Sequence, residues 1–337
     1  GCSSIWGGSA PSMPYTKNHK GQGPAWANSL FEDNAEYGLG MFLGTKAVRE
    51  TLSSKITQAL EEGLGSDELK ATFADWQANI NEGEGSRERA EKLTELLEAE
   101  KGDNALLNEI YDKKDFFVKR SQWIIGGDGW GYDIGYGGLD HVLASGEDVN
   151  VLILDTEVYS NTGGQSSKAT PAAAIAQFAA TGKRTKKKDI GMMAMSYGYV
   201  YVAQIALGAN PAQAVKVISE AESYNGPSLI IGYAPCELHG IAKGGMNHCQ
   251  DEMKKAVKAG YWNLFSFNPA LKAEGKNPFT LTSKEGDGTY QEFLNNEARY
   301  TRLVKPFPER AEKLFAESEK AAKERYEHLL KLVELYK

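Results

Sequence analysis

The sequence has little cysteine, no excess of basic residues and no long apolar run. Its three cysteines among 337 residues are too few for a set of internal disulfides, which favours a reducing cytoplasm. The net charge of −7 argues against a nucleic-acid partner, because neutralising phosphates requires a basic face. No apolar stretch approaches the ~20 residues that span a bilayer, and no signal peptide is evident. We therefore expect a cytoplasmic protein that binds neither nucleic acid nor membrane.

What is present is ordinary for a globular protein of about two domains, with 41% hydrophobic and 25% charged residues. The chain begins Gly1-Cys2 without an initiator Met. This start favours a piece of something longer, although removal of Met before Gly would leave the same end.

The composition changes along the chain and predicts four regions. Residues 1–44 are rich in Gly, Ser, Pro and aromatics, so we expect ordered loop with short elements and no long helix. Residues 45–119 have helical spacing, with Leu52, Ile56 and Leu60 four positions apart, and resemble a helical insertion. Residues 120–262 form the core, and residues 263–337 are an extension that ends in a long amphipathic helix from Phe307.

The core region alternates between strand and helix patterns. Predicted strands cover 123–125, 149–155, 192–195 and 228–233; predicted helices lie around 139–143, from Pro171 through an Ala-rich stretch, and over 211–224. This order indicates an α/β fold with a parallel sheet and right-handed crossovers. In such sheets ligands bind beyond the carboxyl ends of the strands.

Two of these strand ends hold residues that suit a metal bound to a diphosphate. Asp128 stands between Gly127 and Gly129, which let backbone N–H groups approach a phosphate. Thr156 follows the next strand with a hydroxyl, the Val158 carbonyl could be a third ligand, and the Asn161 amide would face the cofactor. Mg²⁺ binds such oxygens together with phosphate and water. The alternative is a tight turn at Gly-Asp-Gly and a helix cap at Asp155.

Gly127-Asp128-Gly129 followed by Asn161 resembles the bipartite signature of thiamine diphosphate enzymes. More specifically, the segments Gly1–Gly38, Gly127–Pro171 and Ala234–Gly240 (APCELHG) resemble single-chain pyruvate:ferredoxin oxidoreductases. The resemblance implies the thiamine diphosphate-binding α/β fold, with a helical insertion and a C-terminal helix. It implies that Asp128, Thr156 and the Val158 carbonyl bind Mg²⁺ and that Asn161 lies near the reacting carbon. The implied cofactor-lining residues are Cys2, Gly127, Asp128, Gly129, Trp130, Thr156, Glu157, Val158, Tyr159, Ser160 and Asn161.

The resemblance also implies a [4Fe–4S] cluster. Spacing alone favours Cys2, Cys236 and Cys249 as small buried hydrophobes. In the family one cluster ligand corresponds to Cys2 and one to Cys236, while a Cys-x-x-Cys pair upstream supplies the other two; Cys249 matches no ligand and stays a core residue.

The implied activity is oxidative decarboxylation of pyruvate with coenzyme A to acetyl-CoA and CO₂, with electrons passed to ferredoxin or flavodoxin. The implied partners are the remaining domains or subunits, including a pyrimidine-binding domain that carries the activating Glu, in an enzyme expected to be a homodimer. Two alternatives stay open: a non-redox thiamine diphosphate decarboxylase or synthase, and a non-catalytic cofactor-binding fragment.

The basic run 183–188 is either a solvated loop or a docking patch for an acidic ferredoxin. His141, His239 and His248 show no metal-ligand spacing.

Overall fold

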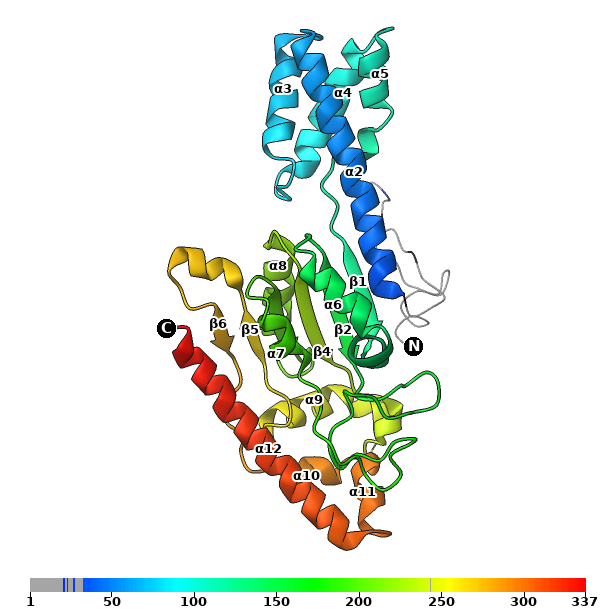
Figure 1. Ribbon diagram of the computed structural model, residues 1–337, viewed down its shortest axis with the longest axis vertical. Helices are drawn as coiled ribbons and strands as arrows, with labels where there is room; N and C mark the ends of the chain where they lie inside the picture. Colours follow the sequence, from blue (N-terminus) through cyan, green and yellow to red (C-terminus); the bar gives the residue numbers. More distant parts are fainter. Residues whose placement is uncertain (1–20, 22, 24–26, 28–32, 243) are drawn as a thin grey trace. The chain divides into compact units, whose positions relative to one another are not determined.

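The computed structural model describes residues 21, 23, 27, 33–242 and 244–337. Cys2 lies outside these residues. The chain divides into two compact units: Gly38–Gln122 forms one, and the described residues up to Tyr37 and from Trp123 to Lys337 form the other (Figure 1).

The first unit is helical, and a single apolar core holds it together. Fully buried side chains on its helices meet there, including Leu52, Phe73, Trp76 and Leu93. Ser66 and Asn104 accept hydrogen bonds from the backbone N–H groups of Leu69 and Leu107, which caps two of the helices. The elements are α2 (Asn34–Glu61), which belongs to this unit from Gly38 onward, α3 (Asp67–Ala78), α4 (Ser86–Glu100), α5 (Ala105–Tyr111) and the 3₁₀ turn η1 (Lys114–Phe116).

Helix α2 corrects one prediction, because it begins at Asn34 whereas residues 1–44 were expected to hold no long helix. The Asn34 side chain donates to the Ile125 carbonyl at 2.9 Å and anchors the start of the helix. Gly38, Gly40 and Gly44 each cost about 1 kcal/mol relative to Ala in a helix. The helix nevertheless extends through them, since propagation from its buried stretch adds one hydrogen bond per residue.

The second unit is built on a six-stranded sheet of order β1-β2-β4-β3-β5-β6. The first four strands in this order pair in parallel, whereas β5 pairs antiparallel with both β3 and β6. Strands β3 and β4 are buried throughout, as expected for the centre of a parallel sheet. The strands are β1 (Trp123–Gly127), β2 (Asn150–Asp155), β3 (Tyr201–Ile205), β4 (Ser228–Tyr233), β5 (Phe265–Phe267) and β6 (Phe279–Leu281).

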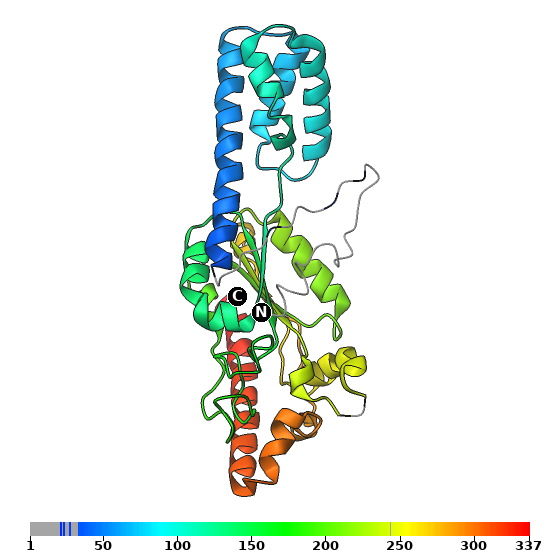
Figure 2. The same ribbon diagram turned by 90° about the vertical axis from the view of Figure 1, so that its right-hand side faces the viewer.

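Helices cover the sheet on both sides. Figure 2 shows α6 and α8 on opposite faces, and α12 packs against β6, α10 and α11 (Figure 1). The α-helices are α6 (Tyr136–Ala144), α7 (Ile190–Met195), α8 (Pro211–Ser223), α9 (Cys249–Lys258), α10 (Tyr290–Asn295), α11 (Ala298–Val304) and α12 (Pro308–Leu335). Shorter helical turns are η2 (Gly129–Ile134), η3 (Glu237–His239), η4 (Gly245–His248) and η5 (Pro269–Glu274). The α/β fold class and the long C-terminal helix are confirmed.

Two local predictions are wrong. The stretch expected as a strand at 192–195 belongs to helix α7, and the strand that precedes α8 is β3. The Ala-rich stretch after Pro171 forms no helix. It is a folded loop whose backbone groups bond to distant segments: Ala173 N to Lys183 O, and Ile175 N to Arg299 O, both at 2.8 Å.

Among the helices of the described residues, none combines the length and apolarity needed to cross a membrane.

Candidate functional site

The site lies at the carboxyl ends of β1 and β2. The parallel register pairs Gly127 with Leu154, which brings Asp128 beside the residues that follow β2. One carboxylate oxygen of Asp128, Oδ1, accepts from Thr156 Oγ1 at 2.7 Å and from Thr156 N at 3.2 Å. The other accepts from Ser167 Oγ at 2.8 Å. Asp128 is 1% exposed, so these hydroxyls replace water as the hydrogen-bond donors to its carboxylate.

A third oxygen completes the donor set, since Thr156 Oγ1 lies 3.0 Å from the Val158 carbonyl. The Thr156 hydroxyl has one hydrogen and two acceptors, so it satisfies only one of them at a time. Adjacent ligands of an octahedral Mg²⁺ at ~2.0–2.1 Å lie about 2.9 Å apart. The two observed spacings of 2.7 and 3.0 Å match that edge length. Thr156 Oγ1 therefore lies at the spacing of adjacent Mg²⁺ ligands from both Asp128 Oδ1 and the Val158 carbonyl.

The electrostatics also favour a cation at Asp128. Burial and the neighbouring Asp155 carboxylate raise the pKa of Asp128 to about 7, against hydrogen bonds from Thr156 and Ser167 that lower it. Within the described residues no three His, Cys, Asp or Glu side chains gather as a metal site. The donor set thus offers one carboxylate, one hydroxyl and one carbonyl, which suits Mg²⁺ that keeps phosphate and water as its other ligands.

Gly126 and Gly129, close to Asp128 in the chain, admit two aromatic rings. A Cβ at Gly129 would lie 2.4 Å from the Tyr159 ring, so the loop after β2 packs directly on the Gly-Asp-Gly segment. A Cβ at Gly126 would lie 2.3 Å from the Trp130 ring. Trp130 is buried, and its indole Nε1 finds no hydrogen-bond partner within the described part of the chain. An orphaned donor beside this segment is consistent with a missing ligand.

The predicted residues after β2 do not all face the same way. Asn161 lies exposed on the loop, and Tyr159 and Ser160 are half-buried. The side chain of Glu157 is 1% exposed, and its carboxylate is held by Lys187, Arg299 and Tyr261. It therefore points into the protein, away from solvent.

The sequence analysis missed His239. This buried imidazole lies in the APCELHG segment, with Nε2 2.7 Å from the Thr156 carbonyl and Nδ1 3.5 Å from Cys236 N. Burial lowers the pKa of His239 to about 3, so the ring is neutral and donates from Nε2 to the carbonyl. His239 thus joins the Thr156 segment to the half-buried Cys236. The sequence signal that could have identified His239 was its position shortly after the predicted strand 228–233.

The basic run is neither wholly solvated nor wholly a surface patch. Lys183 donates to the Ser167 and Thr170 carbonyls at 2.9 and 2.5 Å, and Lys188 donates to the Tyr132 carbonyl at 3.1 Å. Lys187 forms ion pairs with Asp155 at 2.7 Å and with Glu157 at 3.0 Å. These three lysines hold the site loops, whereas Arg184 and Lys186 are exposed.

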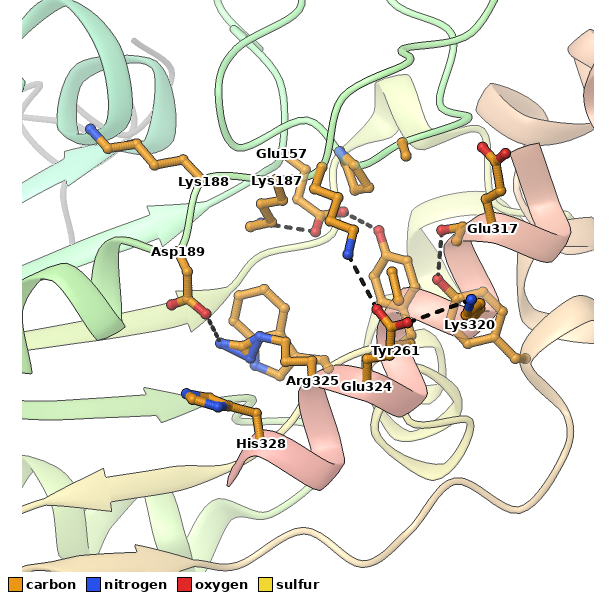
Figure 3. Close-up of a pocket in the computed structure, with 18 of the residues that line it drawn as sticks. Glu157, Lys187, Lys188, Asp189, Tyr261, Glu317, Lys320, Glu324, Arg325 and His328 are labelled. Atoms are coloured by element: carbon orange, nitrogen blue, oxygen red, sulfur yellow. Dashed lines mark hydrogen bonds and ion pairs between the residues drawn. The ribbon is translucent and has the colours of Figure 1, made fainter. Parts of the chain in front are cut away.

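A cavity of about 620 Å³ lies between this run and α12 (Figure 3). Glu157, Lys187 and Tyr261 line it, as do Asp189 and Arg325, which form an ion pair at 2.9 Å. Glu157 and Lys187, which form an ion pair with each other, therefore both line this cavity.

The chain is similar to known proteins over nearly its whole length. The model of the thiamine pyrophosphate enzyme C-terminal TPP-binding domain matches residues 115–231. The chain is 60% identical over 326 residues to the pyruvate-flavodoxin oxidoreductase of Klebsiella pneumoniae. It is 57% identical over 339 residues to the pyruvate:ferredoxin oxidoreductase of Moorella thermoacetica. This chain is homologous to a segment of the pyruvate:ferredoxin and pyruvate-flavodoxin oxidoreductases.

The homology covers 97% and 99% of this chain, which spans 28% and 29% of the length of those two relatives. A solved 2-oxoglutarate:ferredoxin oxidoreductase from Magnetococcus marinus shares 25% identity over 34% of this chain and 40% of its own, with a TM-score of 0.32. The thiamine diphosphate-binding fold assigned from the sequence is confirmed by the matched domain.

Proposed function

We propose that this chain supplies the diphosphate- and metal-binding part of the thiamine diphosphate site of a pyruvate:ferredoxin or pyruvate:flavodoxin oxidoreductase. The observation that carries the proposal is the set of three oxygens, from Asp128, Thr156 and Val158, spaced at 2.7 and 3.0 Å at the ends of β1 and β2. The matched domain and the named relatives support it.

In the proposed site each part of the chain has a distinct task. Asp128, Thr156 and the Val158 carbonyl hold Mg²⁺, and backbone N–H groups from Gly127 to Trp130 approach the diphosphate. Bound thiamine diphosphate would supply the electron sink that decarboxylation of a 2-oxoacid requires. Asn161, exposed on its loop, would face the reactive part of the cofactor. Tyr159, Ser160 and the buried Trp130 form the neighbouring wall.

The complete enzyme would convert pyruvate and coenzyme A to acetyl-CoA and CO₂ and release two electrons through [4Fe–4S] clusters to ferredoxin or flavodoxin. Of the two proposed cluster ligands, Cys236 lies among the described residues and Cys2 does not. The pyrimidine-binding domain, other domains or subunits, and a homodimeric, cytoplasmic enzyme belong to the same proposal. Within it, residues 45–119 are an insertion in a core of 120–262, preceded by the segment 1–44 and followed by the extension 263–337.

The test is metal-dependent binding of thiamine diphosphate, measured by calorimetry with Mg²⁺ and with EDTA. We expect binding only with the dication. Asp128→Ala removes the one charged ligand and should weaken binding at least ~10-fold, the lower range for loss of supporting groups at metal sites. Asp103→Ala, an exposed aspartate in the helical unit, is the matched control and should bind normally. Equal binding in Mg²⁺ and in EDTA would contradict the proposed site.

A further inference from the structure

Glu157 stands between two of the proposed metal ligands in an unusual backbone conformation. Its φ of +59° is left-handed, and among the described non-glycine residues only Ala173 and Phe178 also have positive φ. Such a conformation costs about 1–3 kcal/mol when the surroundings enforce it. It turns the chain so that the hydroxyl of Thr156 and the carbonyl of Val158 come within 3.0 Å. The backbone of Glu157 therefore decides whether the two oxygens converge.

The main chain of Glu157 is held from two directions. Its N–H donates to Asp155 Oδ1 at 3.1 Å, and its carbonyl accepts from Thr170 Oγ1 at 2.6 Å. The Thr156 carbonyl, one residue earlier, accepts from His239 at 2.7 Å. Two of these bonds, from Thr170 and His239, come from other segments, so the turn does not depend on its local sequence alone.

The side chain of Glu157 is held as firmly. Lys187 Nζ lies 3.0 Å from Oε1, and Oε2 accepts from Arg299 at 2.8 Å and from the Tyr261 hydroxyl at 2.6 Å. Figure 3 shows Lys187 and Tyr261 converging on this carboxylate. Arg299 comes from α11, Tyr261 from just after α9 and Lys187 from just before α7. Two cations and a hydroxyl thus hold the Glu157 carboxylate. None of these three partners is a proposed metal ligand.

We propose that Glu157 is a positioning residue for the cofactor metal: its fastened carboxylate holds the turn that spaces Thr156 Oγ1 and Val158 O for Mg²⁺. This inference rests on the proposed function and assigns Glu157 a role away from the cofactor surface. Mg²⁺ demands near-ideal octahedral geometry at ~2.0–2.1 Å, whereas Ca²⁺ tolerates flexible geometry at ~2.3–2.6 Å. A loosened turn should therefore lose more affinity with Mg²⁺ than with Ca²⁺.

The experiment compares thiamine diphosphate affinity in saturating Mg²⁺ and in saturating Ca²⁺ for the unaltered chain and for Glu157→Gln. Glutamine keeps the size but removes the charge that faces Lys187 and Arg299. We expect the ratio of Mg²⁺-supported to Ca²⁺-supported affinity to fall about 10-fold or more, in the range typical for groups that orient metal ligands. Glu157→Asp keeps the charge on a shorter arm and should give a smaller change of the same sign. If the glutamine variant does not fold, the ratio of Mg²⁺-supported to Ca²⁺-supported affinity measured for Glu157→Asp tests the inference.

Glu252→Gln is the matched control, because Glu252 is an equally buried carboxylate whose Oε2 accepts from Asn296 Nδ2 at 2.6 Å and pairs with Lys255 at 3.4 Å. It should alter stability but leave the Mg²⁺ to Ca²⁺ ratio unchanged. A Glu157→Gln chain that melts at a lower temperature yet keeps the ratio would show a purely structural role and overturn the inference. If Asp128→Ala bound the cofactor as the unaltered chain does, the proposed metal site would fail, and this inference with it.

Discussion

Four carboxyl groups are buried near the ends of β1 and β2, and only Asp128 among them forms no ion pair in the described part of the chain. Asp155 pairs with Lys187 and accepts from the Tyr132 hydroxyl, and Glu157 is held by Lys187 and Arg299. Asp128, by contrast, is bonded by the hydroxyls of Thr156 and Ser167. Because a buried carboxylate without a bonded cation is costly, a metal would relieve Asp128 more than its neighbours.

Glu297, the fourth carboxyl group, should make stability depend on pH. Burial raises its pKa to about 7, although the Arg299 guanidinium lowers it. The groups around it are Arg299, Glu157, Glu252 and the neutral His239, whose Nδ1 lies 3.7 Å away. A carboxyl with a raised folded pKa binds its proton more readily in the folded state. Its contribution is therefore present below pH ~4.5 and is lost as the pH rises through about 7.

Glu297→Gln removes that contribution. We expect the free energy of unfolding of the variant, relative to the unaltered chain, to increase between pH 5 and pH 8, as measured by urea unfolding. Glu312→Gln, an exposed glutamate of α12, should show no such trend. A relative stability that stays constant or falls over this interval would show that Glu297 is ionised throughout.

At the scale of elements, the site depends on close packing between β1 and the turn that follows it. Gly126→Ala would place a Cβ 2.3 Å from the Trp130 ring, which must then shift. Overpacking of this kind costs typically ~1–3 kcal/mol. Gly137→Ala in α6 is the control, because a Cβ there meets open space and alanine is the better helix former by up to ~1 kcal/mol. The melting temperature should therefore fall for Gly126→Ala and rise or stay the same for Gly137→Ala. Equal shifts of the melting temperature in the two variants would contradict this packing.

The loop 171–189 shows how tertiary contacts override a local pattern. Alanine content predicted a helix, yet Ala173 has φ of +73° and its N–H bonds to the Lys183 carbonyl. Ala173 and Ala174 are completely buried, so small side chains there serve close packing of the loop. Composition reports small size, but only the fold tells whether that size serves a helix or a close contact.

At the scale of the whole molecule, each unit has a core of its own. Leu93 in the helical unit and Leu229 in β4 are both completely buried. Truncating a buried leucine to alanine costs ~2–5 kcal/mol. Calorimetry of the chain should show two transitions, with Leu93→Ala lowering one and Leu229→Ala the other. Leu93→Ala should also leave the affinity for thiamine diphosphate and Mg²⁺ unchanged. A single transition shifted by both variants would show that the units unfold together.

The sequence alone determined the α/β class, the strands β1, β2 and β4 and the proximity of Asp128 to Thr156. These follow from local patterns: apolar runs of strand length, and polar residues just after them, which parallel strands bring to one edge. Only the tertiary structure decided that Glu157 faces inward, that Lys183, Lys187 and Lys188 support the loops, and that His239 bridges Thr156 and Cys236. Their partners lie far along the chain, as Arg299 does from Glu157, and no periodicity in the sequence records such contacts.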